Sequence, residues 1–124
     1  MIEVRKSVGR GRGVFALRAI REGEVVERAP VIVLPPEMHG FLEHTYLDEF
    51  LFDWRKDRKE AAVVLGFGSL YNHSYAPNAR YVRQFEDQEI HFVAVRDIAG
   101  GEEVLVNYNG AVDDTSPLWF PVEP

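Results

Sequence analysis

Two polar segments carry residue types that could do chemistry, one at residues 72–78 and one at residues 101–108. The first reads Asn-His-Ser-Tyr-Ala-Pro-Asn and lies between two apolar runs, and the second reads Gly-Glu-Glu-Val-Leu-Val-Asn-Tyr, a strand pattern that ends on Tyr108. The amide side chains of Asn72 and Asn78 favour bonds to backbone groups that fix a loop, and Pro77 stiffens it. As structure alone, the first segment is a capped turn.

Serine and metal hydrolysis fit these residues poorly. Ser74 follows His73 directly, but adjacent residues rarely present a nucleophile and its base in line, and no Gly-x-Ser-x-Gly turn surrounds the serine. The 4 histidines are scattered and form no His-Glu-x-x-His pattern. The absence of cysteine excludes a disulfide framework, a thiolate zinc site and a cysteine nucleophile. We therefore predict no metal site.

Charge is unevenly distributed along the chain. The formal net charge is −6, which argues against direct binding of nucleic acid because phosphate neutralisation needs clustered Lys and Arg. Residues 84–124 contain nine acidic residues against the single Arg96, a net of −8. Such a surface can attract a basic peptide by long-range steering, or it can serve solubility alone. Composition does not choose between the two.

The elements that must position these segments are mostly strands. Alternation and β-branched residues predict strands over residues 2–6, 14–17, 25–34, 79–85, 88–95 and 104–106, with a hairpin turn at Glu86 and Asp87. Three glycines in residues 9–13 predict a loop, residues 39–45 are irregular or briefly helical, and one or two helical turns are predicted within residues 61–71. The 124 residues are predicted to form one mostly β domain, 1–124, with no membrane span.

Three motifs together resemble SET-domain protein lysine methyltransferases. Gly-Arg-Gly-Val-Phe at 11–15, the 72–78 segment and the 101–108 segment occur in the order found in that family, and the fit spans nearly the whole chain. Leu-Gly-Phe-Gly at 65–68 is similar to the compact viral histone lysine methyltransferase type. The resemblance implies a SET-domain fold of small curved sheets with little helix. It also implies a C-terminal pseudoknot that brings Asn72 and Tyr108 side by side.

The resemblance further implies that the cofactor is S-adenosyl-L-methionine. Backbone groups of Arg12 and Gly13 would line its methionine end, Asn72 would contact its amino acid portion, and main-chain groups of His73 would meet the adenine. Tyr108 takes the family's catalytic tyrosine position, beside the transferring methyl. A phenol oxygen suits that place, because methyl transfer to a neutral lysine amine is an in-line displacement that needs alignment and electrostatic support at the sulfonium.

The lysine channel that the resemblance implies would be narrow and apolar. Tyr71 and Tyr81 are predicted to flank it, and Val106 stands where the family often has Phe or Tyr. A smaller side chain there adds room, which favours more than monomethylation. As structure alone, Tyr108 is a strand-end aromatic in the core. No His or carboxylate is an obvious base for the lysine, so loss of its proton to solvent is expected.

Many relatives carry cysteine-rich modules beside the SET core, and this chain has none. Trp119 or Phe120 could instead fold back over the adenine, or the two could cap the core or form a dimer contact. The resemblance predicts an enzyme that methylates a basic protein segment such as a histone or histone-like tail, with a homodimer as the expected assembly. A catalytically silent SET-like module that binds a basic peptide is the alternative. The chain is expected to be soluble and intracellular, either cytoplasmic or, as a viral or secreted effector, in a host nucleus.

Overall fold

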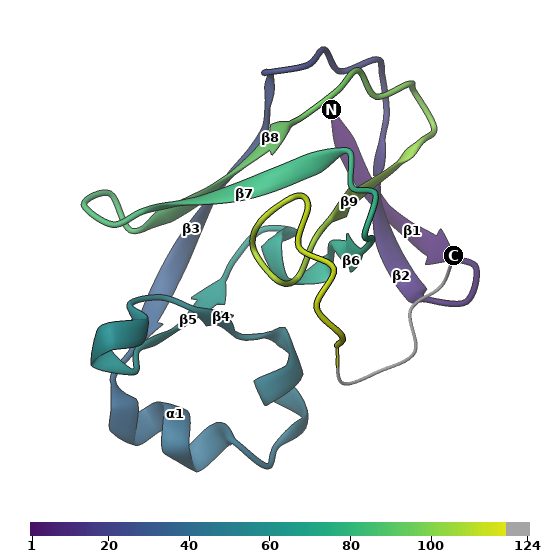
Figure 1. Ribbon diagram of the computed structural model, residues 1–124. Coiled ribbons are helices and arrows are strands. Elements are labelled where there is room, and N and C mark those ends of the chain that lie inside the picture. The colour runs from purple at the N-terminus through teal and green to yellow at the C-terminus, as the bar shows by residue number, and fades with distance from the viewer. Residues whose placement is uncertain (119–124) are drawn as a thin grey trace.

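The computed structural model describes residues 1–118, which form two curved β-sheets with short helical turns (Figure 1). The first sheet has the order β1-β2-β9-β6 and the second has the order β4-β5-β3-β8-β7. The strands are β1 (Ile2–Ser7), β2 (Gly11–Ala16), β3 (Val25–Leu34), β4 (Phe52–Asp53), β5 (Ala61–Val64), β6 (Asn72–His73), β7 (Ala79–Gln84), β8 (Glu89–Ala94) and β9 (Glu103–Val106). The helical turns are α1 (Pro36–Leu42), η1 (Tyr46–Phe50), η2 (Lys56–Arg58) and η3 (Gly68–Leu70).

The long strand β3 changes partner at its proline. Residues 25–30 of β3 pair with β8, and residues 31–34 pair with β5. Pro30 lies at the end of the β8 pairing, where its lack of an N–H removes no ladder bond to β8, and its carbonyl accepts the Leu65 N–H at 2.9 Å. The predicted extended segment with an interrupting proline is therefore confirmed. The hairpin of β7 and β8 is also confirmed. The glycine loop predicted at residues 9–13 is shorter than expected, because its residues 11–13 belong to β2 and pair with β1.

The helix predicted within residues 61–71 is wrong. Residues 61–64 form β5 in register with Val31–Val64 and Leu34–Ala61 pairs, and η3 supplies a single tight turn afterwards. Buried Ala and Val at these positions fit a sheet flanked by β3 and β4, so tertiary pairing outweighs local helix propensity. The α-helix is α1, which begins at Pro36, because proline's fixed φ suits the first helical turn.

The C-terminal strand is enclosed by earlier parts of the chain, as the pseudoknot expectation requires. β9 lies between β2, which it pairs antiparallel, and β6, which it pairs parallel through Asn72–Leu105 and His73–Val106. Figure 1 shows the segment that follows β9 curling back near β6. The Tyr75 hydroxyl donates to the Ser116 carbonyl at 2.9 Å and fastens this return. The 72–78 segment therefore contacts the stretch of chain that follows β9.

The core lies where the two sheets meet. Several of its residues are at most 2% exposed, and they come from both sheets: Val14, Ala16, Val104 and Val106 from the first, and Ala29, Ile90, Phe92 and Ala94 from the second. Burial of this shared apolar surface fixes the sheets against each other. The site residues that follow β6 and β9 therefore start from a rigid base.

Candidate active site

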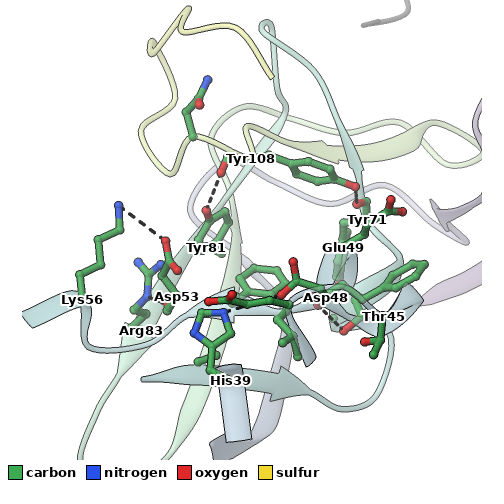
Figure 2. Close-up of a pocket in the computed structure, with 18 of the residues that line it drawn as sticks. His39, Thr45, Asp48, Glu49, Asp53, Lys56, Tyr71, Tyr81, Arg83 and Tyr108 are labelled. Carbon is green, nitrogen blue, oxygen red and sulfur yellow. Dashed lines mark hydrogen bonds and ion pairs between the residues drawn. The ribbon is translucent and has the colours of Figure 1, made fainter. Parts of the chain in front are cut away.

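Tyr108 is held at both its backbone and its hydroxyl. Its hydroxyl donates to the backbone carbonyl of Tyr71 at 2.6 Å, and its N–H donates to Nδ1 of His73 at 2.9 Å. The His73 ring also packs against the Tyr108 ring, with centroids 5.3 Å apart. Figure 2 shows Tyr108 extending from Tyr81 toward Tyr71. The position of the Tyr108 hydroxyl is thus set by contacts on two sides.

The shifted pKa values of Tyr108 and His73 keep the phenol and the imidazole neutral near physiological pH. Burial, followed by the nearby Glu103 and Tyr81, raises the pKa of Tyr108 to about 12. Burial and the charge of Arg10 lower the pKa of His73 below its ordinary value. A neutral imidazole can accept the Tyr108 N–H at Nδ1, as the geometry requires. Tyr108 therefore offers a phenol oxygen and does not act as a phenolate base.

Alkaline pH is expected to destabilise the wild type more than Tyr108→Phe. The folded pKa of about 12 lies above the ordinary value of 10.0, so the folded protein keeps a proton that the unfolded chain has lost. This stabilisation is fully present below about pH 10 and is lost as the pH rises through about 12. Two pKa units correspond to about 2.7 kcal/mol at most. Urea unfolding at about pH 9 and about pH 11.5 measures the difference, and equal losses in both proteins would contradict it.

Asn72 joins the glycine loop to the second motif. Its Nδ2 donates to the Arg12 carbonyl and to Oε2 of Glu103, each at 2.8 Å. A Cβ added at Gly13 would lie 2.8 Å from the same Nδ2 and would also meet Glu103, so only glycine allows this approach. With both amide hydrogens used, the carbonyl oxygen of Asn72 is the group left to accept a hydrogen bond from a ligand.

Glu103 is a site residue that the sequence reasoning did not single out. Its carboxylate accepts from the Ser7 hydroxyl at 2.8 Å and from Asn72, and Arg10 lies 3.9 Å away. The side chain is 12% exposed, so it connects β1, the glycine loop and β6 within a mostly buried network. Its signal in the sequence was the second glutamate of Gly-Glu-Glu, which was used only to recognise the motif.

A pocket of about 960 Å³ opens beside the tyrosines. Tyr71, Tyr81 and Tyr108 all line it, and the Tyr81 hydroxyl donates to the Tyr108 carbonyl at 3.3 Å (Figure 2). The structure therefore brings together the three tyrosines for which the sequence predicts a catalytic role and channel-lining roles. Val106 is 0% exposed and is not among the lining residues. Its place in the channel stays a prediction.

The Asn72 side chain and the tyrosine-lined pocket lie on different sides of the chain at residues 71–72. Asn72 follows Tyr71 directly in extended chain, and side chains of successive extended residues point to opposite faces. Arg12, Gly13, Asn72 and His73 do not line the pocket that Tyr71, Tyr81 and Tyr108 share. A ligand beside Asn72 and a chain inserted into the pocket would thus approach Tyr108 from different sides.

The family model of the SET domain matches residues 11–109 of the chain. The chain belongs to the SET-domain family. The family match, together with a curated relative, identifies this SET domain as a protein lysine N-methyltransferase, as the three motifs predict. A curated relative from Schizosaccharomyces pombe, a histone-lysine N-methyltransferase specific for H3 lysine-37, is 31% identical over 125 residues, which cover 98% of this chain and 78% of the relative.

Solved structures show the same SET fold. A Plasmodium falciparum protein described as a candidate histone methyltransferase has a TM-score of 0.71 and 26% identity, covering 90% of this chain and 99% of that one. A mutant Polycomb Repressive Complex 2 from Chaetomium thermophilum, bound to the inhibitor GSK126, gives 0.75 and 26%, covering 87% of this chain. The match covers 15% of the Chaetomium chain, so it concerns one domain of a much longer protein.

The described residues leave out one predicted part of the cofactor site and hold no metal cluster or membrane-spanning helix. Trp119 and Phe120, predicted to cover the cofactor, lie outside the described residues. Within residues 1–118, no group of three or more His, Cys, Asp or Glu side chains is arranged to hold a metal ion. In that part of the chain no helix is both long and apolar enough to cross a membrane.

Proposed function

We propose that this SET domain transfers methyl groups from S-adenosyl-L-methionine to lysine in a basic protein segment such as a histone tail. The observation that most supports this proposal is the position of the Tyr108 hydroxyl, which donates to the Tyr71 carbonyl at 2.6 Å. Tyr108 lines a pocket that Tyr71 and Tyr81 also line. Support comes from the histone specificity of the Schizosaccharomyces pombe relative. A Chaetomium structure of the same fold, 25% identical and with a TM-score of 0.74, is described as a complex with H3K27me3 and H3K27M.

The residues beside the glycine loop fit the proposed cofactor. The free carbonyl oxygen of Asn72 suits the ammonium of an amino acid, and the bonded Asn72–Arg12–Glu103 network holds it in place. Backbone groups of Arg12 and Gly13, with His73 and Trp119, complete the proposed binding set. When bound there, S-adenosyl-L-methionine would supply an electrophilic methyl group on a sulfonium.

On the pocket side, the chain's own residues orient the lysine amine. Tyr108 presents a neutral phenol oxygen, since its pKa of about 12 keeps the proton at physiological pH. Tyr71 and Tyr81 narrow the pocket beside it and limit the directions from which an amine can approach. The lysine proton leaves to solvent through the open pocket. Val106 is proposed to leave room for more than one methyl group, which mass spectrometry of the product would report.

Carboxylates from one segment surround the pocket. Its lining includes Glu43, Asp48, Glu49 and Asp53, all between α1 and the end of β4. Some of this charge is already matched, because Asp53 lies 3.7 Å from the Lys56 ammonium. Asp48 lies 3.7 Å from the His39 ring. Among the described residues, Glu43 and Glu49 take part in no salt bridge. They are free to attract basic residues that flank the target lysine.

The double substitution Glu43→Gln, Glu49→Gln is expected to raise KM for a basic histone peptide about three- to tenfold with kcat unchanged, because rim charges contribute up to about 1 kcal/mol each. Steady-state kinetics at low and high salt measure this, and salt should shrink the difference. The matched control is Glu86→Gln, Asp87→Asn, which makes the same charge change at the β7–β8 turn. Equal KM values for the two double variants would refute the assignment.

The decisive test is methyl transfer by the purified protein. Labelled S-adenosyl-L-methionine is incubated with histones or with a lysate of the source cell, and mass spectrometry reads the modified lysine and the number of methyl groups. Transfer to lysine supports the proposal. No transfer together with no cofactor binding by calorimetry overturns it, and peptide binding without transfer identifies the silent module instead.

The remaining proposals concern assembly and compartment. We propose a single SET domain over residues 1–124 that acts as a homodimer, which sedimentation equilibrium of the pure protein tests. A histone substrate would place the enzyme where histones lie.

A further inference from the structure

Glu27 is a carboxylate on the inner face of β3. It lies on the same face of the strand as the buried residues Ala29 and Val31, so its partly buried side chain points toward the core. The pairing of β3 with β8 is irregular between Val25 and Glu27, and such a bulge re-aims a side chain. A carboxylate at an inward position is costly unless it is hydrogen-bonded.

Both oxygens of Glu27 have partners. Oε1 accepts the Tyr71 hydroxyl at 2.8 Å, and Oε2 accepts the Phe67 N–H at 3.0 Å. The turn that presents Phe67 passes close above the carboxylate at Gly66, whose φ of +62° and contact with Glu27 leave no room for a Cβ. Glu27 therefore joins β3 to the segment that leads into Tyr71.

Tyr71 is fixed at three points. Its hydroxyl bonds Glu27, its ring stacks on Phe92 with centroids 4.1 Å apart and planes at 20°, and its carbonyl accepts the Tyr108 hydroxyl at 2.6 Å. The side chain is 2% exposed. The carbonyl that holds the Tyr108 hydroxyl thus belongs to a residue whose side chain Glu27 anchors, at the wall of the pocket in Figure 2.

We propose that Glu27 is a positioning residue for methyl transfer: through the Tyr71 side chain it fixes the Tyr71 carbonyl, and through that carbonyl the Tyr108 hydroxyl. This inference rests on the proposed function. Misplacing a reacting group by about 1 Å can cost about a hundredfold in rate, so a hydrogen bond one residue away from the chemistry can set kcat. The hydrogen bonds of the Glu27 carboxylate go to Tyr71 and Phe67, so binding constants should not depend on it.

The test compares Glu27→Gln, Tyr71→Phe and the double variant with Glu24→Gln. Gln keeps the size of the side chain and an oxygen for Phe67, and Phe keeps the ring stacked on Phe92. Glu24 is the matched control, since it also accepts one side-chain bond, from Arg18, and one backbone bond, from Arg21, away from the pocket.

We expect Glu27→Gln and Tyr71→Phe each to lower kcat about tenfold, with peptide KM and cofactor Kd within about twofold, and the double variant to lose no more than the worse single one. Glu24→Gln should keep the wild-type kcat. A purely structural role would lower thermal stability and leave kcat per folded molecule unchanged. Wild-type kcat in both single variants, or losses that multiply in the double variant, would overturn the inference.

A second readout needs no catalysis. In protein labelled with ¹³C at tyrosine Cζ, the Tyr108 signal should shift in Glu27→Gln and Tyr71→Phe and stay in place in Glu24→Gln. An unmoved Tyr108 signal in both single variants refutes the positioning role. If the wild type transfers no methyl at all, the proposed function fails, while this signal still reports whether Glu27 sets the Tyr108 hydroxyl.

Discussion

Tyr108→Phe is expected to lower kcat for lysine methylation by about 10²- to 10³-fold, the loss typical when one preorganised polar group at a reacting centre is removed. The phenyl ring should keep its packing against His73, and the Tyr108 N–H should keep its bond to His73 Nδ1, because neither involves the hydroxyl. What disappears is the oxygen that the Tyr71 carbonyl holds at 2.6 Å. The loss should therefore fall on the chemical step.

Single-turnover methyl transfer and calorimetric cofactor titration separate the two effects. We expect the cofactor Kd of Tyr108→Phe to stay within about threefold of the wild type while the rate collapses. Tyr46→Phe is the matched control, since that tyrosine is 77% exposed on η1 and does not line the pocket. A Tyr108→Phe enzyme that retains a third or more of the wild-type rate would remove Tyr108 from the chemistry.

The strand pattern and the site motifs were readable in the sequence for different reasons. Alternation over β7 and β8 and the turn between them follow from local side-chain chemistry, and the structure confirms them. The bonding of Asn72 and Asn78 to backbone groups was also expected, and both bonds exist. Their partners, however, are Arg12 and Glu103, far away in the chain, and no local rule names a distant partner.

The misassigned helix and the overlooked Glu27 share one physical cause. Residues 61–64 became a strand because β3 and β4 flank them, and Glu27 gains its role because its bonding partners Tyr71 and Phe67 come from a distant part of the chain. Both outcomes depend on pairing between segments, which the local pattern does not contain. The pseudoknot itself was expected only from the resemblance, since threaded connections are rare.

The distribution of charge along the sequence did not predict which carboxylates line the pocket. The sequence concentrates its net negative charge in the C-terminal third, yet the carboxylates that line the pocket come from residues 43–53. That segment reads as nearly balanced, because basic residues such as Lys56 follow closely. Only the folded arrangement shows that Glu43 and Glu49 face the pocket without a salt bridge among the described residues. Local charge on a surface is set by topology and not by sequence blocks.

Asn78→Ala is expected to lower the free energy of unfolding by about 3 kcal/mol, the largest stability loss anticipated for a single polar side chain here. Asn78 is 1% exposed, and its amide donates to the Glu103 carbonyl at 2.7 Å and accepts the Leu105 N–H at 2.8 Å. Alanine leaves both backbone groups of β9 buried without these partners. Each such group costs about 1–3 kcal/mol.

Urea unfolding at constant m-value measures this loss, and Asn109→Ala is the control, because its bonds to the Asp114 and Ser116 carbonyls lie in the more exposed return after β9. The control should lose about 1 kcal/mol or less. Since Tyr108 follows two residues after the end of β9, loosening β9 should also lower the temperature at which methyl transfer is lost. A variant that unfolds like the control would show that pairing with β2 and β6 holds β9 in place without the Asn78 side chain.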